Sequence, residues 1–200
     1  MRLEAEARDC FLFIMSLLKS PATVGALAPS SPQLSRLVAS QAGWGSSHVV
    51  EVGAGTGSIT GALLRRGLPA NRLLVIERDP AFVLHLRKRF PHVRVRCGDA
   101  EHAEEILSEE GISHVETLIS SLPIRNLNGD DRISVVRGMM KAVAPGGHLI
   151  QFTYAANCPI PTEQLGLNAE RLGRVWMNLP PAVVWKFTRS HAPQPQDAVA

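Results

Sequence analysis

A glycine-rich stretch in the first third of the chain carries the clearest chemical signal. Residues 49–57 read Val-Val-Glu-Val-Gly-Ala-Gly-Thr-Gly, an apolar run followed by glycines at alternate positions. Glycine lets the chain turn sharply and lets the backbone approach a ligand with no Cβ in the way. The pattern predicts a strand that runs into a ligand-binding turn, followed by a helix.

The spacing of these glycines distinguishes between classes of nucleotide site. A dinucleotide fingerprint of the form GxGxxG would have its third glycine at position 58, where this chain has Ser58. No lysine follows the turn, which removes the P-loop interpretation. The spacing therefore favours S-adenosylmethionine, whose product is S-adenosylhomocysteine. The turn residues expected to contact this cofactor are Gly53, Ala54, Gly55, Thr56 and Gly57.

Three acidic residues stand where successive predicted strands end. Glu51 precedes the first glycine by two residues, and we expect it to meet the cationic amino group of the cofactor through water. Glu77 is expected to accept hydrogen bonds from the ribose hydroxyls, and Asp99 from the adenine amino group. Ligands of open α/β sheets gather at the carboxyl edge of the strands, so the three acids together indicate one site. Neighbouring residues complete the predicted cofactor set: Arg78, Gly98, Ala100 and Ser120.

The order of apolar runs predicts a Rossmann-like α/β domain. Strand-like and helix-like stretches alternate, which is typical of βαβ units in a parallel sheet covered on both faces. The last two strand-like runs are joined by a short turn with Leu179-Pro180-Pro181, so they must pair antiparallel. The result is a mostly parallel seven-stranded sheet with a C-terminal hairpin. The expected strands are His48–Val52, Arg72–Glu77, His92–Cys97, His114–Ser120, His148–Thr153, Leu172–Asn178 and Val183–Thr188. The expected helices are Thr56–Arg66, Pro80–Phe90, Ala100–Glu110 and Asp131–Val143.

An N-terminal helix with one apolar face is expected ahead of this domain. The predicted organisation is a helical segment at 1–42, the cofactor-binding domain at 43–189 and a frayed tail at 190–200. Such a helix can lie at a membrane interface or pack on the domain, and peripheral membrane contact is the interpretation we favour. Its apolar face contains Leu3, Ala7, Cys10, Phe11, Ile14, Leu17 and Leu18.

Composition excludes several other classes of protein. With 45% hydrophobic and 20% charged residues, the 200-residue chain has the make-up of one globular domain. Its three cysteines are widely spaced and indicate neither a disulfide framework nor a metal site, so we expect a cytoplasmic protein at the inner face of the membrane, with no metal. Four histidines that begin predicted strands are expected to be structural: His48, His92, His114 and His148.

From about Lys19 to Arg189 the sequence resembles the bacterial phospholipid N-methyltransferases, which methylate phosphatidylethanolamine. The first and last similar stretches are the more discriminating, because the middle ones also occur in rRNA adenine dimethylases. Ser121 stands where the family usually has glycine, which can alter the approach of that loop to the substrate. The similar stretches are residues 21–31, the glycine turn, Gly98-Asp99-Ala100, Ser121-Leu122-Pro123, Pro145-Gly146-Gly147, Phe152-Thr153-Tyr154 and residues 178–182.

The resemblance implies methyl transfer to the amine of phosphatidylethanolamine and its mono- and dimethyl forms, toward phosphatidylcholine. Such a reaction mainly needs in-line placement and a free amine lone pair. Ser120, Ser121 and Leu122 would orient the amine, and Tyr154 would hold methylated ammonium by cation–π contact. Tyr154 as a mere strand end is an equally open interpretation. The basic residues expected to bind the lipid phosphate are Arg174 and Arg189.

Other functions remain open from the sequence. Ornithine lipids offer a similar amine to the same chemistry. An rRNA adenine N6-dimethyltransferase would stack the flipped base on an aromatic residue after the loop proline, whereas this chain has Ile124 there, and a dense basic tract is missing. Nucleic acid is therefore not the expected partner. A protein that binds the cofactor and a membrane without catalysis is the non-enzymatic alternative.

Overall fold

The computed structural model describes residues 30–43, 45, 47–177 and 180–190. The predicted N-terminal amphipathic helix lies outside these residues, as does the tail from 191 onward, so the proposed membrane role of that helix stays a prediction. Within the described part, no helix is both long enough and apolar enough to cross a bilayer.

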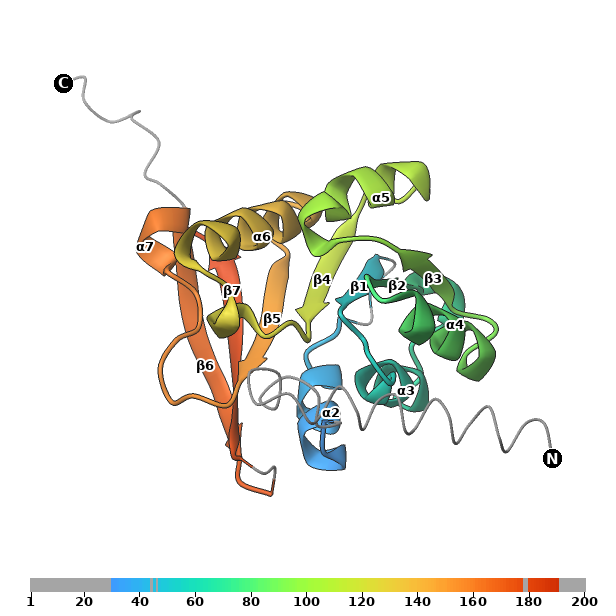
Figure 1. The fold of residues 1–200 in the computed structure, drawn as a ribbon, viewed down its shortest axis with the longest axis horizontal. Coiled ribbons are helices and arrows are strands. Elements are labelled where there is room, and N and C mark those ends of the chain that lie inside the picture. Colours follow the sequence, from blue (N-terminus) through green and yellow to red (C-terminus); the bar gives the residue numbers. More distant parts are fainter. Residues whose placement is uncertain (1–29, 44, 46, 178–179, 191–200) are drawn as a thin grey trace.

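A seven-stranded sheet in the order β3-β2-β1-β4-β5-β7-β6 forms the centre of the domain (Figure 1). β1 to β5 run parallel, and β7 pairs antiparallel with both β5 and β6. This confirms the expected Rossmann-like fold with its C-terminal antiparallel pair. The strands are β1 (His48–Val52), β2 (Leu73–Glu77), β3 (Arg94–Cys97), β4 (Val115–Ser120), β5 (His148–Thr153), β6 (Leu167–Val175) and β7 (Ala182–Arg189).

Helices cover both faces of the sheet because its central strands alternate between two apolar cores. Val49 and Val50 are both buried, but they belong to different hydrophobic clusters. One cluster joins the sheet to α2 (Pro32–Ala39), α3 (Ser58–Arg65) and α4 (Pro80–Arg89). The other joins it to α5 (Ala103–Glu109) and α6 (Gly129–Ala142). The short helices are η1 (Ala70–Arg72), η2 (Ala100–His102), η3 (Ile124–Asn126) and α7 (Thr162–Leu165).

Several bounds differ from those the sequence suggested. α6 begins two residues early because the side chain of Asn128 accepts a hydrogen bond from the Asp131 amide and caps the helix. β6 begins at Leu167 instead of Leu172. Its first half is largely exposed at the sheet edge and shows no apolar alternation, so nothing in its composition marked it as a strand.

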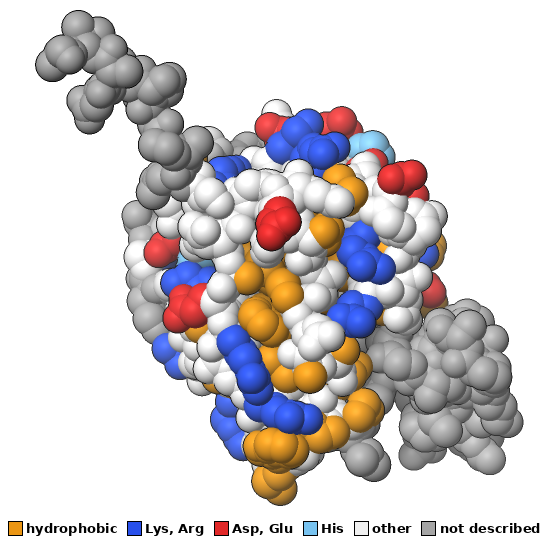
Figure 2. Space-filling view, turned by 90° about the vertical axis from the view of Figure 1, so that its left-hand side faces the viewer, with side chains coloured by type: hydrophobic (Ala, Val, Ile, Leu, Met, Phe, Trp, Pro, Cys, Tyr) orange, Lys and Arg blue, Asp and Glu red, His pale blue; other side chains and the backbone are white. Residues whose placement is uncertain are grey.

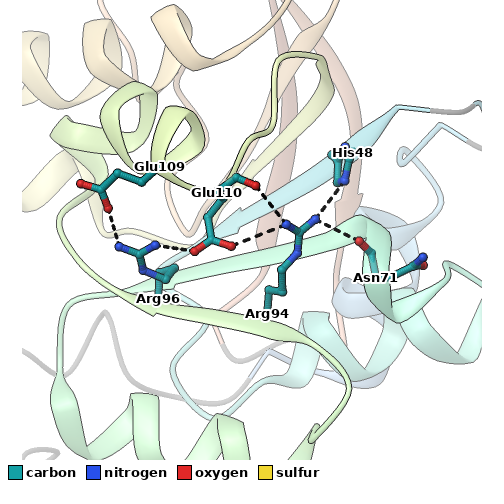
Figure 3. Close-up of polar contacts among 6 residues, drawn as sticks. All are labelled: His48, Asn71, Arg94, Arg96, Glu109 and Glu110. Atoms are coloured by element: carbon teal, nitrogen blue, oxygen red, sulfur yellow. Dashed lines mark hydrogen bonds and ion pairs between the residues drawn. The ribbon is translucent and has the colours of Figure 1, made fainter.

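The starts of the strands are held together by a polar network, drawn in Figure 3. Arg94, at the start of β3, donates to the Asn71 carbonyl at 3.1 Å and lies 3.0 Å from Nε2 of His48. Arg94 and Arg96 also form ion pairs with Glu110, beyond the end of α5. Burial and the nearby Arg94 charge lower the pKa of His48. This histidine is therefore a structural residue at the edge of the sheet opposite the glycine turn.

Gly138 lets α6 pack closely on η2, directly after Asp99. A Cβ at Gly138 would lie 2.3 Å from the carbonyl oxygen of Glu101. Gly138→Ala should therefore lower the free energy of unfolding by about 1–3 kcal/mol, although alanine favours a helix by about 1 kcal/mol. Urea unfolding measures the difference.

Gly129→Ala is the matched control in the same helix, because no atom lies within 4 Å of an added Cβ there. That variant should be neutral or slightly more stable than wild type. Equal stability of the two variants would contradict close packing at Gly138.

Candidate active site

The glycine turn is packed on two sides and open at its middle. Gly53, Gly55 and Gly57 all have positive φ, at 70°, 53° and 78°. An added Cβ would lie 2.6 Å from Leu122 Cδ2 at Gly53 and 2.5 Å from Phe90 Cε2 at Gly57, whereas at Gly55 it would meet nothing within 4 Å. The turn therefore offers open backbone at Gly55, as a ligand-binding turn requires.

Glu77 holds this turn in place from the end of β2. Its Oε2 accepts a hydrogen bond from the Gly55 amide at 2.9 Å, and its Oε1 accepts one from the Asp79 amide at 3.0 Å. The residue is 8% exposed. Each carboxylate oxygen keeps a second lone pair, so ribose hydroxyls can still donate to it.

Asp99 and Arg78 lie on the exposed side of the same edge. Asp99 Oδ1 accepts a hydrogen bond from the Glu101 amide at 3.3 Å and so caps η2. Its Oδ2 lies 3.7 Å from Arg78 Nη1, in an ion pair whose two side chains are partly or largely exposed. Gly98 is packed against Ile106. Glu77 and Asp99 thus lie where β2 and β3 end, as their positions after the strands implied.

Glu51 is fully buried in the middle of the sheet. Its Oε2 accepts a hydrogen bond from the Thr60 hydroxyl at 2.6 Å, while Oε1 has no partner among the described residues. Burial raises the pKa of Glu51 to about 7, against the hydrogen bonds from Thr60 and with a smaller contribution from the charge of Glu77. A buried oxygen without a partner fits a site that receives a cationic group. Thr60, on α3, carried no signal in the sequence.

The loop after β4 closes the other side of the turn. The Ser121 amide donates to the Val52 carbonyl at 2.9 Å, and the Leu122 amide donates to Oγ of the fully buried Ser120 at 3.3 Å. Ser121 Oγ is buried and has no partner among the described residues. Because Leu122 also packs on Gly53, the loop and the glycine turn are directly in contact.

A pocket of about 230 Å³ opens between this loop and the end of β5. Ser121 and Leu122 line one side, and Phe152 and Tyr154 line the other. The two rings lie 6.0 Å apart at an interplanar angle of 76°, an edge-to-face contact. The structure therefore brings Tyr154 to the Ser-Leu-Pro loop, although it does not place Ser120 in the pocket lining.

Gln151 lines the pocket too, and the sequence analysis missed it. The residue is 1% exposed, and its Nε2 donates to the carbonyls of Leu122 at 3.0 Å and Phe152 at 2.7 Å. Oε1 has no partner among the described residues. The only available signal was a polar amide inside the apolar strand 148–153.

The expected phosphate ligands lie elsewhere. Arg189 donates to the carbonyls of Val143 and Ala144 at the end of α6, and Phe187 nearby pairs with Leu149 at the start of β5. Because β7 runs antiparallel, Arg189 is at the edge opposite the pocket, and its expected role is corrected. Arg174 stacks over the ring of Trp176, just after β6, and is not part of the lining. The basic residue that does line the pocket is Arg125.

Within the described residues, no group of three or more His, Cys, Asp and Glu side chains is arranged to hold a metal ion.

Comparisons with known sequences identify methyltransferases. A family model described as "Methyltransferase domain" matches residues 49–147. The ornithine lipid N-methyltransferase of Singulisphaera acidiphila is 36% identical over 150 residues, which cover 73% of this chain and 78% of that protein. A probable ribosomal RNA small subunit methyltransferase A of Haloarcula marismortui is 50% identical over 44 residues, 22% of this chain and 14% of that protein.

Solved structures share the fold. A TehB-like S-adenosylmethionine-dependent methyltransferase from Corynebacterium glutamicum superposes with a TM-score of 0.57 at 20% identity, over 78% of this chain and 86% of that one. The glycopeptide N-methyltransferase MtfA, in complex with S-adenosylmethionine, gives 0.58 at 14% identity over 82% and 96%. Because the family model and the 36% identical relative both match, the chain belongs to the class I S-adenosylmethionine-dependent methyltransferases.

Proposed function

We propose that this enzyme methylates the primary amine of a zwitterionic membrane lipid, seated in the pocket between the β4 loop and the end of β5. The observation that carries the proposal is a pair of buried oxygens beside the glycine turn. Ser121 Oγ and Gln151 Oε1 belong to residues that line the same pocket, and neither has a partner in the described chain. Both can accept hydrogen bonds from an amine.

The pocket chemistry suits an amine nucleophile. When bound, S-adenosylmethionine supplies an electrophilic methyl group. An amine attacks only after it has lost its proton, and burial disfavours the charged ammonium. The oxygens of Ser121 and Gln151 accept hydrogen bonds from the amine and so direct its lone pair. The Phe152–Tyr154 pair offers aromatic surface to a product ammonium that has gained methyl groups.

Two lipid acceptors fit this proposal. Phosphatidylethanolamine is the acceptor implied by the resemblance of the loops, and an ornithine lipid is the acceptor named for the 36% identical relative. Both carry a primary amine near an anionic group. Arg125, at the side of the pocket, is the basic residue that we assign to that group.

Base stacking on RNA has less support. The residue after Pro123 is Ile124, which is 1% exposed and belongs to the core under α6. Its position offers no flat surface to a flipped base. The match to the rRNA methyltransferase covers only 22% of this chain.

We assign the cofactor to the edge where the acids gather. The open backbone at Gly55 would face the cofactor, with Glu77 at its ribose hydroxyls. Asp99, with Arg78 beside it, would receive the adenine amino group. Glu51 would balance the charge of the amino group. This assignment uses the unpaired Oε1 of Glu51, which otherwise has no evident role.

Gly55→Ala should weaken S-adenosylmethionine binding by about tenfold or more, because the new Cβ would fill the open side of the turn. Its positive φ adds about 1–2 kcal/mol of instability. Gly146→Ala is the control, since Gly146 has φ 80° and equally open space before β5. Calorimetry should show normal affinity in the control despite a similar loss of stability. Equal affinity of both variants would refute the assignment.

Glu51→Gln should remove a pH dependence of folding. The folded pKa of about 7 lies above the unfolded value of 4.5, so the contribution to stability is complete below pH 4.5 and is lost as pH rises through 7. The free energy of unfolding of the cofactor-free protein should fall by up to about 3 kcal/mol over this range. Urea unfolding at several pH values should give a flatter curve for the variant.

The same variant tests the charge balance. Wild-type affinity for S-adenosylmethionine should rise with pH as Glu51 ionises, and Glu51→Gln should bind more weakly with a flatter profile. Glu170→Gln is the control, because Glu170 is exposed on β6, 3.9 Å from Lys186. A variant that binds as tightly as wild type at pH 8 would show that Glu51 does not meet the amino group.

The proposed reaction is tested with vesicles that contain phosphatidylethanolamine or ornithine lipid and with methyl-labelled S-adenosylmethionine. We expect labelled mono-, di- or trimethylated headgroups, identified by mass spectrometry. Ser121→Ala removes a buried oxygen without a partner, so stability should be kept or rise while kcat/KM falls about tenfold. Ser190→Ala, beside Arg189 at the opposite edge, should leave kcat/KM unchanged. Folded, cofactor-bound protein that methylates neither lipid would refute the proposal and favour a non-catalytic role.

A further inference from the structure

The turn between β6 and β7 carries exposed apolar side chains. Trp176 is 69% exposed and Met177 is 76% exposed. Among the large hydrophobic residues of the described chain, the only other strongly exposed one is Leu84, on α4. On the face of the molecule that Figure 2 shows, hydrophobic side chains project at the lower end, beside basic side chains. A solvated tip of this composition indicates a partner surface.

Two basic side chains lie on β6, ahead of the apolar turn. The Arg174 guanidinium lies 4.0 Å from the centroid of the Trp176 ring, and Arg171 is exposed on the same strand. The sequence has no acidic residue from 171 to 190. An aromatic ring and a thioether in front of arginines match the order of layers in an anionic bilayer, where acyl chains lie beneath phosphates.

The tip extends from the same edge of the sheet as the pocket. Val175 pairs with Ala182 at the end of the hairpin, and Val183 pairs with Thr153, the last residue of β5. Phe152 and Tyr154, at that end of β5, line the pocket. A surface that meets the tip therefore also faces the side of the domain on which the pocket lies.

We propose that this tip, defined as Arg171, Arg174, Trp176 and Met177, docks into the interface of an anionic lipid bilayer and holds the pocket toward the lipid headgroups. This inference rests on the proposed function, because docking helps catalysis only if the methyl acceptor is a lipid. The docking itself follows from the exposure, charge and position of the tip. It is separate from the predicted contact through the N-terminal helix.

The test uses the full chain and vesicles of phosphatidylcholine with or without phosphatidylglycerol. The double variant Trp176→Ser/Met177→Ser should reduce binding to anionic vesicles about tenfold or more. Arg171→Gln/Arg174→Gln should reduce binding at low salt and remove most of its salt dependence. Leu84→Ser, at an apolar position of α4 that is 57% exposed, is the control and should bind as wild type does.

Activity separates the docking from the proposed reaction. The tip variants should lose methyl transfer to a vesicle lipid but keep it with a short-chain, monomeric phosphatidylethanolamine. If wild type methylates no lipid amine while the tip variants still lose vesicle binding, the reaction is refuted and the docking stands. Wild-type vesicle binding by the double variant overturns the docking. A change in its elution volume together with unchanged vesicle binding would assign the tip to a second copy of the chain, and would also overturn it.

Discussion

A carboxylic acid buried in the middle of the sheet is the constraint on which the site depends. Glu51 stands between the apolar neighbours Val50 and Val52, and only Thr60 offers it a hydrogen bond within the described chain. Ionising a buried carboxyl is costly without a cation, so burial by itself favours the neutral acid. In the proposed assignment, the cationic group of the cofactor would reverse that preference, and binding would be coupled to deprotonation of Glu51. Without a cation nearby, the buried carboxyl lowers the stability of the fold above neutral pH.

The remainder of the site follows from where the parallel strands end. β1, β2 and β4 finish side by side, so the glycine turn, Glu77 and the Ser121 loop meet without a long connection. Hydrogen bonds link them directly, from the Gly55 amide to Glu77 and from the Ser121 amide to Val52. The three loops consequently form one unit, and movement of any one of them changes the shape of the proposed cofactor site.

The sequence predicted those parts of the molecule whose geometry is local. The glycine turn follows from the conformation that Gly53 and Gly55 must adopt, and the strand-end acids follow from their position after apolar runs. The position of Arg189 could not be predicted from local sequence, because it depends on the direction of β7 in the sheet. The antiparallel direction places Arg189 at the end of α6. Gln151 was missed for the same reason. Its importance comes from contacts with Leu122 and with its own neighbour, which no spacing in one strand encodes.

The antiparallel direction of β7 places the exposed turn between β6 and β7 at the same edge of the sheet as the pocket. A parallel strand in the place of β7 would begin at the opposite edge, and its preceding turn would lie far from the pocket. Because β7 runs the other way, the turn before it lies at the edge where Thr153 ends β5. The exposed Trp176 is thus on the same side of the domain as Tyr154, which lines the pocket. In the proposed reaction, an amphiphilic substrate would present its amine to the pocket while its acyl chains remain in the bilayer. This avoids the large free-energy cost of moving those chains into water.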